Sequence, residues 1–344
     1  MIDKKTRKAD IIAVAKAARV SPSTVSRSFN HPQMVNPATR KKITRAVERL
    51  GYIRNRAAQT MHGRRSGTIG LIVPTINHTI FSQVIQSFSD AIDAAGFTLL
   101  ITSHGYDLDR EYAMLRKLLE HRVDGIALIG FEHTTASFNM IEQQDIPTIA
   151  IWNYMQESTM SCVGADNVLA GRLAAQHLLS LGHRKIGLVF PSVSGNDRAG
   201  DRQSGVLATL AESAVTVPDF WRTQTPYSIA QAKQVCIDLL ALDHRPTALL
   251  CGNDVIAQGA VFASQHMGLN VPGDVSVIGI GDFVGSEDME PGLTTIRIPA
   301  QKIGKIAGDQ LTQAITSENN QVFRYRCELQ CVVRGTTARP NMNC

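Results

Sequence analysis

The sequence predicts an α/β protein in which an N-terminal three-helix head with a helix-turn-helix precedes a core of two lobes with parallel sheets. Three observations carry this prediction. Two short helical patterns meet at a turn near the N-terminus, basic charge is concentrated in the same region, and buried-strand patterns alternate with amphipathic helices from residue 68 onward.

The helix-turn-helix is predicted in residues 14–30. Apolar residues recur at helical spacing on both sides of a turn, at Val14, Ala15, Ala18, Val20, Val25 and Phe29. Ser21 is a suitable N-cap for the second helix, and Pro22 fits its first turn, where no N–H is needed. The other face of that helix presents Ser23, Ser26 and Arg27 to solvent, and these side chains suit the edges of bases in a major groove.

A third helix completes the head. Asn36 and Pro37 form its predicted start, apolar residues recur at helical spacing as far as Leu50, and Gly51 fits a left-handed C-cap. We therefore take residues 1–52 as a DNA-binding head and residues 53–67, which are basic and closed by glycines, as a hinge helix and linker.

Charge supports a nucleic-acid partner independently of the helical pattern. Residues 1–66 contain 16 Lys and Arg against 3 Asp and Glu, whereas the remaining 278 residues contain 19 against 27. Cations placed near phosphates release condensed counterions, so this concentration is the electrostatic signature of a DNA-binding head. The alternative is a solubilising basic tail, which the regular helical patterns among the charges disfavour.

Residues 68–344 are long enough for two lobes with full cores. Expected strands are 68–74, 97–101, 124–129, 147–151, 185–190, 247–251 and 275–280, and expected helices are 79–95, 109–121, 134–144 and 167–181. This alternation predicts parallel sheets that bind a ligand at the carboxyl ends of their strands, in the cleft between the lobes. The first lobe is expected to span about 68–165 with 297–323, and the second about 166–292 with 324–344.

Composition excludes several other classes. No apolar run approaches the roughly 20 residues needed to span a bilayer, and the polar N-terminus is no signal peptide, so we expect a cytoplasmic protein without a membrane partner. The six cysteines show no metal-ligand spacing, and we expect no metal and no cofactor.

Residues 14–30 resemble the head of the LacI/GalR family of bacterial transcription regulators. That head carries the motif Val-Ala-x-x-Ala-Gly-Val-Ser-x-x-Thr-Val-Ser-Arg-x-Leu-Asn. Further matches occur in family order: Thr-Arg at 39–40, Leu-Gly-Tyr at 50–52, Ile-Gly-Leu-Ile-Val-Pro at 69–74, Asp-Gly-Ile at 124–126, Gly-His-Arg-Lys-Ile at 182–186, Arg-x-x-Gly at 202–205, Asn-Asp at 253–254, Val-Pro-x-Asp-Val-Ser-Val-Ile-Gly at 271–279, Pro-x-Leu-Thr-Thr-Ile at 291–296 and Val-Arg-Gly-Thr-Thr at 333–337. The resemblance implies a core like that of a periplasmic sugar-binding protein.

The resemblance also implies which residues touch DNA. These are Ser21, Pro22, Ser23, Thr24, Ser26, Arg27, Asn30, Tyr52, Asn55, Arg56, Ala58 and Met61. Pro22, Ser23 and Arg27 match base-reading positions, although a phosphate contact alone is the alternative for Arg27. The segment 55–61 resembles the hinge helix that inserts an apolar side chain into the minor groove, with Met61 in place of the usual Leu.

Three further departures from the family concern the head and hinge. Arg19 stands at the turn where relatives commonly have Gly, so a left-handed backbone there would be strained. Ala13 replaces a common Asp and Arg54 a common Pro. None of these changes removes a base-reading residue, and they bear on the operator affinity.

Effector contacts are expected from loops that follow the strands of the first lobe, at Asn77, His78, Phe81, Tyr106 and Asn153. By resemblance, four second-lobe residues match ligand-contacting positions of relatives: Asp166, Arg202, Asn253 and Asp282. Amides, acids and a guanidinium beside an aromatic wall suit a polyol. A surface ion pair is the alternative for Arg202, and plain packing is the alternative for His78 and Tyr106. Gly-Ile-Gly-Asp at 279–282 is similar to relatives that sense gluconate-like sugar acids.

By resemblance, the chain is expected to form a homodimer on a pseudo-palindromic double-stranded operator, with a sugar, sugar acid or sugar phosphate as effector. It is expected to repress genes of carbohydrate or sugar-acid catabolism and to catalyse no reaction. Induction and co-repression stay open, as does control by a protein co-regulator.

Two other classes of protein fit the sequence less well. A sugar-binding protein without a DNA role would have no use for the basic head. A dinucleotide-binding enzyme would need a third glycine after Gly279 and Gly281.

Overall fold

The computed structural model describes residues 9–53, 65–77, 81–317 and 321–341. The chain forms two compact units, residues 1–66 and residues 67–344. Within the described residues, the helices are too short or too polar to cross a membrane. Most of the predicted hinge and linker lies outside the described residues.

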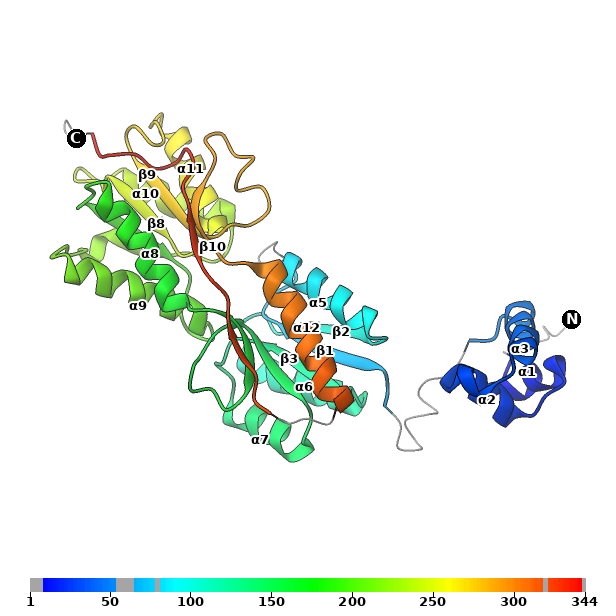
Figure 1. Cartoon of the computed structure of the whole chain (residues 1–344). Coiled ribbons are helices and arrows are strands. Elements are labelled where there is room, and N and C mark those ends of the chain that lie inside the picture. The colour runs from blue at the N-terminus through cyan, green and yellow to red at the C-terminus, as the bar shows by residue number, and fades with distance from the viewer. Residues whose placement is uncertain (1–8, 54–64, 78–80, 318–320, 342–344) are drawn as a thin grey trace, which may run out of the picture. The chain divides into compact units, whose positions relative to one another are not determined.

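The head contains three helices, as predicted: α1 (Ile11–Ala18), α2 (Pro22–Asn30) and α3 (Pro37–Leu50) (Figure 1). Its core joins apolar side chains from all three helices: Val14, Ala15, Ala18, Val25, Ile43 and Ala46. The predicted caps are also present, because the Asn36 side chain accepts a hydrogen bond from the Ala38 N–H and Gly51 has a φ of 59°. The head therefore presents α2 on a small but complete core.

Arg19 occupies the predicted strained position in the turn between α1 and α2. Its φ of 57° and ψ of 47° are left-handed, and its N–H closes α1 by hydrogen bonding to carbonyls of the preceding turn. A side chain with a Cβ costs about 1 kcal/mol in this conformation, whereas glycine does not.

Arg19→Gly is therefore expected to stabilise the head by about 0.5–1 kcal/mol, the conformational entropy of glycine in the unfolded chain offsetting part of the gain. Hydrogen exchange of the α1 and α2 amides in the full chain should slow by roughly twofold to fivefold. Arg19→Ala keeps the Cβ and serves as the control. Faster exchange in the glycine variant than in the alanine variant would contradict this account.

The first lobe is built on a six-stranded sheet with the order β11-β5-β4-β3-β1-β2. Its strands are β1 (Thr68–Val73), β2 (Thr98–Ser103), β3 (Gly125–Ile129), β4 (Thr148–Asn153), β5 (Ser161–Ala165) and β11 (Arg324–Arg326). All neighbouring strands run parallel. The helices are α5 (Ser82–Ala94), α6 (Leu108–Glu120), α7 (Thr135–Gln144) and α12 (Ala300–Ser317). Helix α5 packs along α12, and α6 contacts α7 (Figure 1).

The second lobe repeats this plan with the order β12-β10-β9-β8-β6-β7. Its strands are β6 (Ile186–Phe190), β7 (Arg222–Gln224), β8 (Ala248–Cys251), β9 (Ser276–Gly281), β10 (Thr294–Arg297) and β12 (Gln330–Val332), of which only β12 is antiparallel to its neighbour. Helix α8 (Asn167–Ser180) pairs with α9 (Asp197–Glu212), and α10 (Ile229–Leu240) pairs with α11 (Asp254–His266). In both lobes the strand order reverses beside the first strand, which is where such sheets bind ligands.

The chain passes between the lobes three times, and two of the expected boundaries need correction. Strand β10 extends to Arg297 in the second sheet, so the return to the first lobe begins after residue 297. The sequence prediction places residues 324–326 in the second lobe, whereas β11 pairs with β5 in the first sheet. The last crossing therefore lies between β11 and β12. Strand β11 covers the backbone of β5, which would otherwise be the exposed edge of the first sheet.

Candidate DNA interface and effector cleft

The second helix of the head begins at a hydroxyl cap. The backbone of Ser21 is extended, and its Oγ accepts a hydrogen bond from the Thr24 N–H at 3.2 Å. The same oxygen lies 2.8 Å from the hydroxyls of Ser23 and Thr24. Pro22 follows in the first helical turn. The helix N-terminus and three hydroxyls thus form an exposed polar edge, which suits phosphates and the edges of bases.

Arg27 lies farther along α2 and is exposed, whereas Val25 and Ser28 face the core. Ser26 accepts a hydrogen bond from the side-chain amide of Asn30 at 3.2 Å. The helix therefore separates an inward apolar side from an outward side with one long guanidinium. Such a guanidinium can donate two hydrogen bonds to a guanine.

Of the remaining predicted DNA-contacting residues, the structure describes only Tyr52. Tyr52 is half-buried against Phe29, with ring centroids 6.4 Å apart, so its ring supports the end of α2. Four predicted DNA-binding residues and one predicted effector residue lie outside the described residues: Asn55, Arg56, Ala58, Met61 and His78.

The core contains a cavity of about 580 Å³ between its lobes. Thr75, Gly105 and Tyr106 line it from the first lobe. The second lobe contributes Pro191, Ser192, Ser194, Asn196, Gln224, Thr225, Pro226, Tyr227, Ser228 and Gln231. The rings of Tyr106 and Tyr227 lie 5.8 Å apart, and burial raises the pKa of the Tyr106 phenol. The predicted aromatic wall is therefore a tyrosine pair, of which sequence analysis identified one member.

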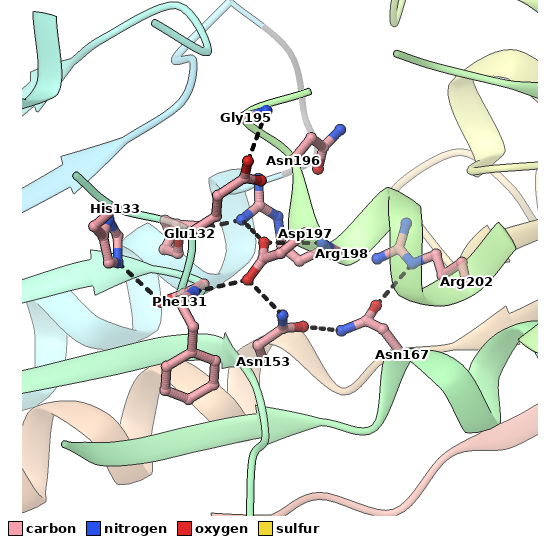
Figure 2. Close-up of polar contacts among 12 residues, drawn as sticks. Phe131, Glu132, His133, Asn153, Asn167, Gly195, Asn196, Asp197, Arg198 and Arg202 are labelled. Carbon is pink, nitrogen blue, oxygen red and sulfur yellow. Dashed lines mark hydrogen bonds and ion pairs between the residues drawn. The ribbon is translucent and has the colours of Figure 1, made fainter. Parts of the chain in front are cut away.

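A buried relay joins Arg202 of α9 to the first lobe. Its guanidinium donates from Nε to the Asn167 side chain at 2.8 Å and from Nη1 to the Gly252 carbonyl at 3.0 Å. The Asn167 amide in turn donates to the Asn153 side chain at the end of β4, and the Asn153 amide donates to Asp197 at 2.9 Å (Figure 2). The carboxyl ends of β4 and β8 are thus connected through one guanidinium and two amides.

Two glycines bring the backbones of α8 and α9 close enough to form this relay. A Cβ on Gly171 would lie 2.0 Å from the carbonyl oxygen of Arg202, and a Cβ on Gly205 would lie 2.0 Å from that of Val168. Only glycine fits at such a crossing. The Arg-x-x-Gly motif at 202–205 therefore supplies two features of α9. Arg202 is the buried guanidinium, and Gly205 allows the close approach to α8 that positions it.

Asn253 lies next to Gly252, where β8 meets α11. Its side-chain oxygen caps α11 by accepting from the Ile256 N–H at 3.0 Å, while its Nδ2 is buried without a hydrogen-bond partner. A buried unpaired amide is costly, so this N–H is a position where a ligand oxygen would bind favourably. The cap fixes the side chain before any ligand arrives.

The neighbouring Asp254 has a structural role. Burial raises the pKa of its carboxyl, although the carboxylate accepts hydrogen bonds from the Thr295 hydroxyl, the Phe283 N–H and the Ser286 hydroxyl. These contacts tie the start of α11 to the ends of β9 and β10. The Asn-Asp pair therefore combines a candidate ligand contact with a buried anchor.

Among the described residues, Tyr106 is the one expected effector residue that lines this cavity. Hydrogen-bond networks of the core hold four others: Asn153, Asp166, Arg202 and Asn253. The remaining three have different surroundings. Phe81 is buried and packs edge-on against Trp152 at 5.2 Å, so it belongs to the core of the first lobe. Asp282 has each carboxylate oxygen bound by a guanidinium, from Arg297 at 2.6 Å and from Arg334 at 2.7 Å. Asn77 is exposed. Packing already satisfies the side chain of Phe81, and ion pairing satisfies that of Asp282, so this arrangement gives no support to their expected effector roles.

Asp166 caps α8, accepting a hydrogen bond from the Leu169 N–H at 2.9 Å, and belongs to an acidic group that sequence analysis missed. Burial, followed by the nearby carboxylates of Asp197 and Asp166, raises the pKa of Asp201 to about 6. Its folded pKa exceeds the unfolded value of 3.8, so protonation of Asp201 favours the folded state. Stability from this group is gained as the pH falls through about 6 and is lost as the pH rises.

Asp201→Asn is accordingly expected to raise the free energy of unfolding by roughly 1 kcal/mol at pH 7.5, after discounting for solvent screening. At pH 5 the gain should be smaller, since the parent carboxyl is then largely protonated. Urea unfolding of both proteins at the two pH values measures the difference, and an equal gain at both would contradict this interpretation.

The comparisons with known proteins agree with the geometry of the head and the core. Residues 10–55 match the model for bacterial regulatory proteins of the lacI family, and residues 175–337 match a periplasmic binding protein-like domain. The HTH-type transcriptional repressor PurR of Serratia proteamaculans is 31% identical over 326 residues, covering 93% of this chain and 95% of the relative. The chain belongs to the LacI family of bacterial regulatory proteins.

Two solved structures of the LacI family show the same fold. The lac repressor dimer bound to operator and the anti-inducer ONPF has a TM-score of 0.84 at 25% identity, covering 96% of this chain and all of that one. A LacI family regulator from Enterococcus faecium with bound ribose has a TM-score of 0.71 at 26% identity, covering 80% and 100%. This LacI family member is therefore a DNA-binding transcription regulator with a ligand-binding core.

Several residues of the cleft escaped sequence analysis: Asn167, Asp197, Arg198, Asp201 and Tyr227. One signal for them was present. Arg198 and Arg202 are four residues apart on one helix that follows a strand, so they share the helix face nearest the carboxyl end of the sheet. Tyr227 gave no such signal, because it lies in a loop after the short strand β7.

Proposed function

We propose that this protein represses carbohydrate or sugar-acid catabolism genes and that a small polyhydroxylated effector in the interlobe cavity controls its affinity for operator DNA. The observation that carries the proposal is an interlobe cavity with a tyrosine pair, together with the buried polar side chains of Arg202, Asn253 and Asn153. Arg202 is bound there by an amide and a carbonyl, and Asn253 keeps one buried N–H unpaired. Hydroxyl, carboxylate or phosphate oxygens suit both side chains.

The DNA contacts in this proposal come from the polar edge of α2 and from Arg27, with Tyr52 supporting the helix from behind. A homodimer would place two such helices on a pseudo-palindromic operator, since the symmetry of the site follows that of the protein. The lac repressor dimer bound to operator supports this arrangement by similarity. The effector residues of the proposal are Tyr106, Asn153, Asp166, Arg202 and Asn253.

The experiment is a fluorescence anisotropy titration of purified protein into its own upstream DNA, alone and with a panel of sugars, sugar acids and sugar phosphates. Release of the DNA by one compound identifies an inducer, and a requirement for one compound identifies a co-repressor. DNA binding that no compound changes would contradict control by a sugar-like effector and favour a protein co-regulator. Failure to bind at low salt would contradict the operator assignment.

A further inference from the structure

Asp197 presents its carboxylate to the opposite lobe. Its Oδ2 accepts hydrogen bonds from the Phe131 N–H at 2.7 Å and from the Asn153 amide at 2.9 Å, both in the first lobe. Its Oδ1 accepts from Arg198, at 2.7 Å from Nη1 and at 2.8 Å from the backbone N–H. The carboxylate is therefore held by donors from both lobes, and four hydrogen bonds satisfy it without a ligand.

Arg198 adds a second connection between the lobes. Besides the bond to Asp197, its Nη1 donates to the carbonyl oxygen of Ile129 at the end of β3, at 3.1 Å. The guanidinium is 6% exposed. Two residues before Asp197, the Gly195 N–H donates to Glu132 at 3.2 Å. The start of α9 and the residues just before it thus contact the end of β3 and the loop that follows it, at Ile129, Phe131 and Glu132 (Figure 2).

The loop that receives these contacts is itself held in place. Gly130 has a φ of 82°, and a Cβ there would lie 2.4 Å from Arg198 Nη1. The Gly130 carbonyl accepts a hydrogen bond from His133 Nε2 at 3.1 Å, and His133 Nδ1 lies 2.8 Å from the Glu111 carboxylate. These side chains fix the loop from within the first lobe, so the surface that meets Asp197 and Arg198 is already formed.

We propose that Asp197 and Arg198 form a clasp that holds the two lobes together. The clasp shares Asn153 with the relay through Asn167 to Arg202. An effector that draws the Asn153 amide to itself therefore removes one of the two first-lobe donors from Asp197. This second step rests on the proposed function, whereas the clasp itself does not.

The charges around the clasp favour a contact between the lobes that can break and form again. Separating a buried ion pair into water restores the hydration of both ions, so the pair holds the lobes without locking them. The carboxylates of Asp166 and Asp201 lie near that of Asp197 and add repulsion. Burial first, and the charges of Asp197 and Asp166 second, raise the pKa of Asp201. Removing one partner leaves the other without its counter-charge and is expected to shift the lobes toward the open arrangement.

Hydrogen exchange of the full-length protein, without DNA or effector, tests the clasp. Asp197→Ala and Arg198→Met each remove one half. Peptides that contain the Phe131 and Gly195 amides should exchange at least about tenfold faster in both variants. The buried strands β3 and β6 should keep their protection, which shows that each lobe stays folded.

The matched control is Glu212→Gln, also on α9. It breaks an exposed ion pair with Arg172 at 3.0 Å, which joins α8 to α9 within the second lobe. Its exchange at Phe131 and Gly195 should equal that of the parent. Parent-like exchange in both clasp variants would overturn the proposal, as would equal acceleration in the control.

The two proposals fail in different ways. Faster exchange in the clasp variants, together with DNA binding that no compound on the panel changes, would retain the clasp and remove the effector step. With a compound that does change DNA binding, both clasp variants should reach half of the response at roughly tenfold lower concentration. An unchanged half-response concentration would overturn the coupling between the clasp and the effector.

Discussion

Arg27→Ala is expected to weaken binding to the operator by about tenfold to hundredfold, because a guanidinium bound to a guanine contributes roughly 1–3 kcal/mol of discrimination. Arg27 is exposed on α2, behind the capped N-terminus, and its removal leaves no hole in the core of the head. Binding to random DNA should weaken far less, since one lost phosphate attraction is a small share of a basic head. Anisotropy titrations on both DNAs at one salt concentration measure the ratio.

A control separates base reading from general charge. Arg49 is an exposed cation in the last turn of α3, so Arg49→Ala changes the net charge by the same amount. It should reduce operator and random-DNA binding about equally, by a few-fold. Equal losses on the two DNAs for Arg27→Ala would show that Arg27 contacts phosphate only.

Arg202→Met is expected to abolish the effector response while operator binding persists. The substitution removes the donors to Asn167 and Gly252, and with them the buried charge that we propose binds the ligand oxygens. Truncating one partner of a buried, charged hydrogen bond typically costs 2–5 kcal/mol, so the affinity for an effector from the panel should fall about a hundredfold or more. Calorimetric titration of the effector measures this loss.

Arg172→Met provides the comparison for Arg202→Met. Arg172 is a half-exposed cation on α8 whose partner Glu212 is more exposed still, and the pair lies within the second lobe. Effector affinity in this variant should match the parent. Because Arg202 is buried, thermal unfolding of both variants must also show a cooperative transition. A folded Arg202→Met protein that responds at the parent effector concentration would contradict the assigned role.

The head was predictable because its signals are local. Ser21, Asn36 and Gly51 satisfy the backbone groups at helix ends within a few residues, so sequence alone places those ends. The left-handed turn at Arg19 was suggested by the resemblance alone, because relatives commonly have Gly at that position. The long buried strands were also evident, since each is a continuous apolar run between helical patterns.

The edge strands and about half of the cleft residues could not be predicted from the sequence. Strands β7, β11 and β12 have three residues each and are defined by pairing with distant partners, which no local pattern reports. The packing of Phe81 depends on Trp152, which is distant in the sequence. The ion pairs of Asp282 likewise depend on Arg297 and Arg334, from other parts of the chain. Contacts of this kind decide whether a polar or aromatic residue binds a ligand or satisfies the fold.

The clasp illustrates the same limit. Asp197 and Arg198 look like ordinary charged residues in the first turn of a helix, where an acid is favourable anyway. Their importance comes from Ile129, Phe131 and Asn153, which the first sheet delivers to the same place. A prediction of that contact would have required the relative position of two sheets.

The central claim is that the operator and the cleft effector share one coupled equilibrium. The most direct measurement is a calorimetric titration of the compound that changes DNA binding in the panel experiment. It is titrated into the protein with and without bound operator. We expect the two effector affinities to differ by about 5-fold to 150-fold, the usual range of allosteric coupling, with no such difference in Arg202→Met. Equal effector affinity in the presence and absence of operator would contradict the coupling of the two sites.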